Sequence, residues 1–202
     1  MNLAQFLISL SIMFSIIMIL PDTVHAAEIN CGPSPFEDQC EGTNDNDVMK
    51  GTNEKDWING NDGDDRIVAL SGCDEIKGGD GDDVIDGGND GECAVLGGDG
   101  DDVINGGPGG DDELVGDDGN DRISGGPGDD ISMAGGEGDD ILNGGPGDDS
   151  ISHGGISAFP FTDSDGGQDK IDCGPGNDEV TINVGTDNDQ VKNCETVHTE
   201  ND

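Results

Sequence analysis

One nine-residue unit recurs in tandem from Gly42 to Ser152, and it constrains this chain more than any other feature. Each unit reads G-G-x-G-x-D-x-U-x, where U is a large apolar residue. The aspartate recurs at Asp47, Asp56, Asp65, Asp74, Asp83, Asp102, Asp112, Asp121, Asp130, Asp140 and Asp149. An aliphatic residue usually follows two positions later, as in Ile58, Ile67 and Ile85. A fixed short period predicts a stack of equivalent units rather than a conventional layered domain.

Each unit divides into a turn and a very short strand. The Gly/Asp-rich half suits a turn, because glycine permits positive φ angles, and its glycine density excludes a helix. The x-U-x half predicts a strand of three residues with one inward apolar side chain. Alternating turns and short strands, when stacked, give an all-β parallel β-solenoid.

The spacing of the acids is regular at first and then varies. It is nine residues from Asp47 to Glu92, and ten in the steps Glu92–Asp102, Asp102–Asp112 and Asp130–Asp140. In the middle step, Gly110 is interpreted as a loop insertion. In the other two, a one-residue bulge would bring Val95 and Met133 inward in place of Ala94 and Ser132.

The composition favours metal cations as partners. The chain has 202 residues with 47 acidic and 7 basic side chains, so its formal net charge is −40. Such a charge disfavours nucleic acid and anionic lipid as partners and keeps an isolated chain expanded. Only 30% of the residues are apolar, while 37 are glycine, so a thin repetitive core is expected.

Residues 1–26 are predicted to be a secretory signal peptide, with cleavage before Ala27. The run from Leu3 to Leu20 is almost wholly apolar and ends at Pro21. A retained membrane anchor is the alternative, because the run is nearly long enough to span a bilayer. Both interpretations place the repeats outside the cytoplasm, and only the second makes the membrane a partner. The remaining segments are a cap at 27–41, the main repeats at 42–152, an inserted loop at 153–163, terminal repeats with a second cap at 164–197, and a tail at 198–202.

The repeats resemble the calcium-binding nonapeptides of the repeats-in-toxin (RTX) family. Gly78–Asp86 and Gly97–Asn105 fit the motif at every position, and the likeness covers about 140 of 202 residues. The resemblance implies a right-handed parallel β-roll with two nonapeptides per turn and calcium ions between successive turns. The chain departs from the motif in the units that begin at Gly42 and Gly51, in Ala69–Asp74, and at Glu92.

The same resemblance implies a set of metal ligands. In the family the aspartate binds through its side chain and the glycine-rich loops bind through carbonyl oxygens. Besides the aspartates above, the expected ligands are Asp169, Asp178, Gly79, Gly81, Gly98, Gly100, Gly107, Gly109, Gly126, Gly128, Gly136, Gly138, Gly145 and Gly147. No catalytic residue and no cofactor other than calcium is expected.

Calcium suits such loops because it accepts six to eight oxygens in irregular geometry. If alternate units stack, 12 continuous units give at most 12 − 2 = 10 sites. Without calcium, carboxylate repulsion predicts a disordered chain, and binding then supplies the free energy of folding. In the Asp-Asp pairs we expect the second acid, as in Asp83 and Asp140, to bind the ion. The first, as in Asp82 and Asp139, is expected to be a solvated charge.

The six cysteines are expected to form disulfides, as an even number in an exported chain suggests. The separation between Cys73 and Cys93, like that between Cys173 and Cys194, slightly exceeds the length of two nonapeptide units. One roll turn of about 18 residues plus local insertions would bring each pair together on neighbouring turns. Cys31 and Cys40 would close a local loop, and the outer pairs would cap the ends of the solenoid.

The chain is therefore predicted to be a secreted calcium-binding structural or adhesive protein and not an enzyme. Outside the repeats and the leader, no stretch exceeds about 15 residues, which is too short for a catalytic domain. A non-catalytic remnant or accessory of an RTX enzyme is the less favoured alternative. The other alternative is a module that binds a surface polysaccharide or protein, with the outward Trp57 as a sugar-stacking residue. Phe159–Phe161 is either a partner-binding patch or a plain loop, and His153 and His198 are expected on the surface.

Overall fold

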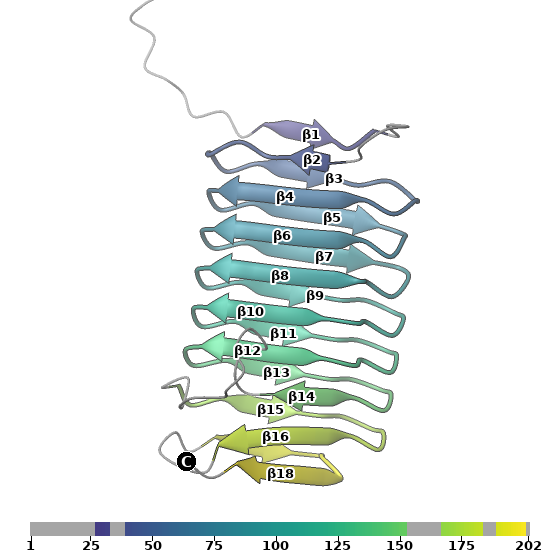
Figure 1. The fold of residues 1–202 in the computed structure, drawn as a ribbon, viewed down its shortest axis with the longest axis vertical. Helices are drawn as coiled ribbons and strands as arrows, with labels where there is room; N and C mark the ends of the chain where they lie inside the picture. Colours follow the sequence, from purple (N-terminus) through teal and green to yellow (C-terminus); the bar gives the residue numbers. More distant parts are fainter. Residues whose placement is uncertain (1–26, 33–38, 153–166, 184–188, 201–202) are drawn as a thin grey trace, which may run out of the picture.

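The computed structural model describes residues 27–32, 39–152, 167–183 and 189–200. Within these ranges the chain forms 18 short strands and no helix (Figure 1). None of this part could therefore cross a membrane as a long apolar helix. The predicted leader and the whole inserted loop, including His153 and Phe159–Phe161, lie outside the described residues.

The strands form two parallel sheets of nine strands each. The odd sheet contains β1 (Glu28–Asn30), β3 (Val48–Lys50), β5 (Arg66–Leu70), β7 (Val84–Gly88), β9 (Val103–Asn105), β11 (Arg122–Ser124), β13 (Ile141–Asn143), β15 (Lys170–Asp172) and β17 (Gln190–Lys192). The even sheet contains β2 (Gln39–Glu41), β4 (Trp57–Asp62), β6 (Glu75–Asp80), β8 (Ala94–Asp99), β10 (Leu114–Asp118), β12 (Met133–Glu137), β14 (Ser150–Ser152), β16 (Glu179–Asn183) and β18 (Thr196–Glu200).

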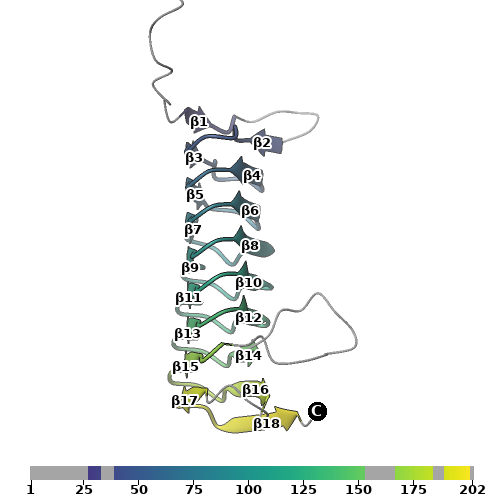
Figure 2. The ribbon, with the colours of Figure 1, turned by 90° about the vertical axis from the view of Figure 1, so that its left-hand side faces the viewer.

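The chain alternates between the two sheets, so that each turn adds one strand to each (Figure 2). This is a parallel β-solenoid of about eight turns, which confirms the predicted fold class. Loops that lead into odd strands stack along one side of the solenoid, which we call the odd edge. Loops that lead into even strands stack along the other side, the even edge.

The core consists of two columns of apolar side chains, one from each sheet. The middle residue of each short strand points inward, as Ile67 (0% exposed), Ile104 (1%) and Leu142 (0%) do. The flanking residues point outward, and Trp57 is 47% exposed as predicted. Because each strand contributes so few apolar groups, burial of apolar area alone gives this fold little stability per turn.

The turns lengthen by one residue partway along the solenoid. Equivalent loop acids are separated by 18 in the sequence from Asp65 to Asp83, and by 19 from Asp83 to Asp102. On the even edge the extra residue lies beside Asp74, whose carbonyl accepts bonds from the amides of both Cys93 (3.1 Å) and Ala94 (3.2 Å). Two residues opposing one is the pattern of a β-bulge.

The bulge has the predicted effect on the core and corrects one predicted position. Val95 (0% exposed) and Met133 (1%) point inward, as expected from the spacing. The interpretation of Gly110 as an insertion is wrong, because Gly110 stacks between Gly91 and Asp129 at the same loop position. The extra residue of that turn follows the loop acid instead.

All three predicted disulfides are present. They join Cys31 to Cys40, Cys73 to Cys93 and Cys173 to Cys194, with Cα–Cα distances of 5.3, 4.9 and 5.2 Å. The second bond connects two neighbouring turns at the place where the turn length changes.

Candidate metal sites

Each loop edge contains a continuous column of buried acidic side chains. The odd-edge column is Asp47, Asp65, Asp83, Asp102, Asp121, Asp140 and Asp169. The even-edge column is Asp56, Asp74, Glu92, Asp111, Asp130, Asp149 and Asp178. Every one of these residues is at most 3% exposed. Carboxylates are seldom buried without a partner, so the two columns need a specific explanation.

One oxygen of each carboxylate is satisfied by the backbone of the preceding turn. The amide of Asp47 donates to Asp65 Oδ1 (2.7 Å), and the amide of Asp65 donates to Asp83 Oδ1 (2.7 Å). The same bond repeats along both columns, at 2.7 to 3.1 Å. It continues past them to Asp189 and Glu195 at the last turn. These bonds fix the direction in which each carboxylate points.

In ten of the fourteen acids the second oxygen has no such partner, whereas in Asp47 and Asp56 it accepts a hydrogen bond from the amides of Thr43 and Thr52 (both 2.6 Å). It is buried and makes no hydrogen bond in Asp65, Asp74, Asp83, Glu92, Asp102, Asp111, Asp121, Asp130, Asp149 and Asp178. A buried acceptor without a donor is costly, and it is more costly still when it carries a negative charge. Bound cations are a common way to satisfy such groups in proteins.

In most units the first residue is a glycine that lies directly in front of this second oxygen. A Cβ atom added to Gly78 would collide with Asp83 Oδ2 and would lie close to the carbonyl oxygen of Gly97 in the next turn. The same arrangement repeats at Gly97, with Asp102 Oδ2 and the Gly116 carbonyl. Carboxylate and carbonyl oxygens from two turns therefore converge where glycine leaves the space open. We call this space the cradle.

The second and fourth glycines have a different role, because they shape the turn. Of the twelve glycines predicted as carbonyl ligands, all but Gly128 have positive φ, from 109° at Gly107 to 156° at Gly147. They stack on the equivalent residue of the preceding turn, as Gly98 does on the carbonyl of Gly79. A residue with a side chain would be strained in these backbone conformations.

Burial makes these carboxyl groups weak acids. Desolvation is the largest cause in each case, and it raises the pKa of Glu92 and of Asp102 to about 8. The pKa of Asp130 is raised to about 7, and that of Asp121 to about 6. Negative charges on neighbouring turns add to the rise, whereas the backbone hydrogen bond opposes it. The buried columns thus favour either protons or another cation.

The structure brings together the predicted acids, with one change. Asp111 occupies the even-edge column, and Asp112 is exposed outside it. The predicted position is thus corrected by one residue, because the bulge places its extra residue between the acid and the strand. Glu92, at a position where the motif has aspartate, is 1% exposed and belongs to the column.

Sequence reasoning misses two sets of residues. Asp111 could be found from the repeat of a full turn, because it lies 19 residues from both Glu92 and Asp130. The role of the first glycines in the cradles is also missed. Their φ angles are ones that any residue adopts, and only the absence of a side chain matters. In the pairs whose second acid belongs to a column, as in Asp82–Asp83, the first acid is exposed as expected, and Asp82 accepts a hydrogen bond from the amide of Asp101 on the next turn (3.0 Å); the Asp111–Asp112 pair is reversed, with its first acid buried.

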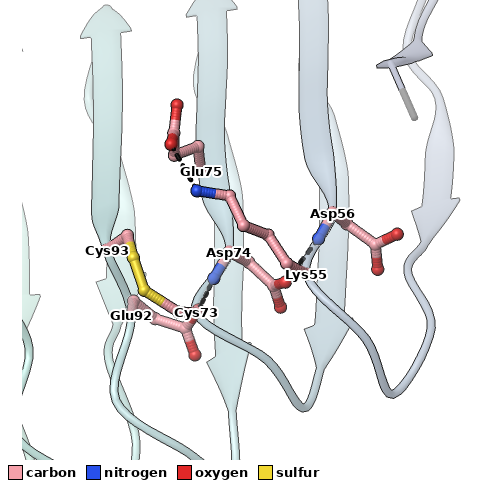
Figure 3. A network of polar contacts seen from close by, with 7 residues as sticks. All are labelled: Lys55, Asp56, Cys73, Asp74, Glu75, Glu92 and Cys93. Carbon is pink, nitrogen blue, oxygen red and sulfur yellow. Dashed lines mark hydrogen bonds and ion pairs between the residues drawn. A yellow bond between two sulfur atoms is a disulfide. The ribbon is translucent and has the colours of Figure 1, made fainter. Parts of the chain in front are cut away.

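Figure 3 shows the even edge at its bulge. The amide of Asp56 points to the carboxylate of Asp74, and the amide of Asp74 points to Glu92. The Cys73–Cys93 disulfide lies beside these two acids. Lys55 forms an exposed ion pair with Glu75 (2.6 Å), and its charge opposes the rise in the pKa of Asp74 that burial causes.

A hard cation that accepts carbonyl ligands fits this arrangement. Among the described residues, no three His, Cys, Asp or Glu side chains converge as a metal site of their own. An ion between turns would therefore take one or two carboxylate oxygens and fill its shell with loop carbonyls. Calcium binds in this way, whereas zinc sites are mostly four-coordinate and usually include histidine or cysteine ligands.

The fold and the site together define a class: a parallel β-solenoid whose glycine-rich loops align buried carboxylates. A model of one family, described as the RTX calcium-binding nonapeptide repeat (4 copies), matches residues 41–73, 63–91, 95–111, 109–135 and 132–155. The chain belongs to this family. No curated protein matches the chain.

Proposed function

We propose that the protein binds several calcium ions between successive turns of the solenoid. Each ion takes the free oxygen of a buried acid together with carbonyl oxygens of the loops on two turns. The single observation that carries this proposal is the row of buried second oxygens that make no hydrogen bond. The family match supports calcium as the ion.

We further propose that the chain folds when it binds calcium. The formal charge of −40 opposes compaction, and the columns hold like charges on neighbouring turns. Calcium neutralises this charge only when the loops are stacked, so binding and folding are linked. Cytosolic calcium is too low for sites of the weak, extracellular kind, and the chain would fold after export.

The three disulfides support an extracellular location, since such bonds persist in oxidising compartments. In this setting the protein acts as a rigid structural or adhesive element. The predicted leader would direct it there, as a cleaved signal or as a retained anchor.

Calcium binding is tested by isothermal titration of the oxidised, metal-free protein with calcium and then with magnesium. We expect saturable binding of several calcium ions, with much weaker binding of magnesium, which requires strict octahedral geometry. Absence of calcium binding at about 10 mM, well above the affinity of extracellular modules, would contradict the proposal.

A calcium-dependent polysaccharide-binding role is a second candidate, supported by the exposure of Trp57 on the outer face of β4. The Lys55 ammonium group lies 5.9 Å from the centre of its ring, so one neighbour already contacts it. Binding of the calcium-loaded protein to a glycan array, lost in Trp57→Ala, is the expected result for this role. Equal binding by the variant would exclude Trp57 as the sugar contact.

A further inference from the structure

The two loop edges differ in the residue that opens each loop. The odd-edge loops that are described over their whole length begin with glycine, at Gly42, Gly60, Gly78, Gly97, Gly116 and Gly135, whereas Ile182 holds this position before the last odd strand. The even-edge loops begin with Cys31, Gly51, Ala69, Gly87, Gly106, Gly125, Gly144, Cys173 and Asn193. The backbone bonds confirm this equivalence, since Cys31, Gly106 and Cys173 each donate to the residue before the next loop.

A side chain at this position fills the cradle. None of the first glycines has positive φ, so the position does not require glycine for its backbone. It requires glycine because a Cβ atom would collide with the free oxygen of the loop acid, as at Gly106 with Asp111 Oδ2. Ala69 carries such a Cβ atom and is fully buried, and so is Cys173.

The acids of these two loops are also placed differently from the others. A Cβ atom at Gly72 or Gly176, the fourth residue of each loop, would meet Oδ1 of Asp74 or Asp178. In the loops that begin with glycine, the fourth glycine faces only backbone of the neighbouring turn, as Gly100 does. Both acids keep a buried second oxygen without a hydrogen bond. The loops that begin with Ala69 and Cys173 therefore differ from the loops that begin with glycine in the cradle and not in the free oxygen of the acid.

On the even edge, every loop with a filled or missing cradle contains a cysteine of a disulfide. Cys31 and Cys173 occupy the first position themselves, and Cys194 follows Asn193. In the Ala69 loop, Cys73 binds Cys93 of the next turn, with Cα atoms 4.9 Å apart. Within the part of the chain that the structure describes, no cysteine lies on the odd edge.

We propose that the disulfides replace calcium at the even-edge loops that cannot hold it. The Cys73–Cys93 bond thus takes the place of an ion beside Asp74, and Cys173–Cys194 does so beside Asp178. On this basis, which rests on the proposed calcium binding, the odd edge is held together by metal alone. The even edge is held by metal in its middle and by covalent bonds at both ends and at the bulge.

The first test counts bound calcium in the oxidised protein by equilibrium dialysis and metal analysis at saturation. Ala69→Gly opens the cradle of Asp74, and we expect one additional ion. Gly106→Ala fills a cradle without straining the backbone, and we expect one ion fewer. Ala134→Gly, the same substitution within β12 rather than at the start of a loop, is the matched control and leaves the count unchanged.

The outcomes separate the two proposals. If the unaltered protein binds no calcium, the proposed function fails. If it binds calcium but Ala69→Gly and Gly106→Ala leave the count unchanged, calcium binding stands and the replacement proposal is overturned.

The second test asks whether an ion can substitute for the bond. In Cys73→Ser/Cys93→Ser with calcium, we expect the amide of Ala94, which bonds to Asp74, to exchange about tenfold faster or more. Adding Ala69→Gly restores slow exchange in calcium but not in EDTA. Equally fast exchange with and without Ala69→Gly in calcium would overturn the proposal.

Discussion

At the scale of the residue, the two oxygens of a loop carboxylate such as that of Asp121 have separate tasks. Oδ1 accepts a hydrogen bond from the backbone of the neighbouring turn and so belongs to the fold. Oδ2 is buried without a hydrogen bond, and we assign it to the metal. One side chain thereby links the stacking of the turns to the binding of the ion.

Asp121→Asn separates these tasks, because the amide oxygen can still accept the backbone bond while the charge is lost. We expect calorimetric titration to show weaker calcium binding and the loss of about one ion. The metal-free variant should contain at least as much β-structure as the parent, because burial raises the pKa of Asp121 and disfavours its charge. Asp82→Asn, at an exposed acid, is the control and should titrate like the parent. A parent-like titration for Asp121→Asn would contradict its role as a ligand.

The position of most column acids can be predicted from sequence, and the exception has a physical cause. A nonapeptide search counts from acid to apolar residue within one unit, and this assigns Leu114 to Asp112. In the structure the acids are aligned from one turn to the next, because hydrogen bonds join equivalent acids 19 residues apart. The requirement for glycine at the first position of a loop cannot be predicted from φ angles, because it arises only from contacts between the stacked turns.

At the scale of the element, each strand from β3 to β16 places one large side chain in the core cluster, and the bulge decides which residue that is. Ile123 in β11 is 1% exposed in the core, whereas Ile131 is 63% exposed beside the bulge. In the sequence, both isoleucines follow a loop acid closely, so this position alone does not show which of them is buried. The inward position of Met133 is predictable, because the added residue shifts the alternation of the strand.

Ile123→Ala tests the element directly. Removing a buried aliphatic side chain commonly destabilises a protein by about 2–5 kcal/mol. We therefore expect the calcium concentration at the folding midpoint to rise, as measured by circular dichroism. Ile131→Ala serves as the matched control and should leave the midpoint unchanged. Equal midpoints for both variants would contradict the assigned core.

At the scale of the whole molecule, the solenoid gathers its negative charge in two parallel edges. The class of fold follows from the period of the sequence, and the three disulfides follow from the spacing of the cysteines. That every disulfide includes a cysteine of an even-edge loop could not be predicted, because it depends on which loops face the same side once the turns stack. The same limit applies to the cradles that Ala69 and Cys173 fill.

The buried columns also predict how the metal-free protein responds to pH. Burial raises the pKa of Glu92 and Asp102 from ordinary values of 4.5 and 3.8 to about 8. The folded form therefore binds more protons than the unfolded form between about pH 4 and pH 8. This contribution to stability is fully present below about pH 4 and is lost as the pH rises through about 8.

In EDTA we accordingly expect circular dichroism to show more β-structure at pH 4 than at pH 8. With calcium at neutral pH, binding should release protons, which titration in buffers of different ionisation enthalpy would measure. A metal-free protein that becomes more structured as the pH rises from 4 to 8 would contradict this assignment of the buried acids.

The most direct test of the central claim is a calcium titration of the oxidised protein from EDTA at pH 7.5, followed by circular dichroism, with magnesium as the control. The account predicts a cooperative transition from coil to β-structure with calcium and little change with magnesium. A fully formed β-spectrum in EDTA, or a chain that stays unfolded in about 10 mM calcium, would contradict it.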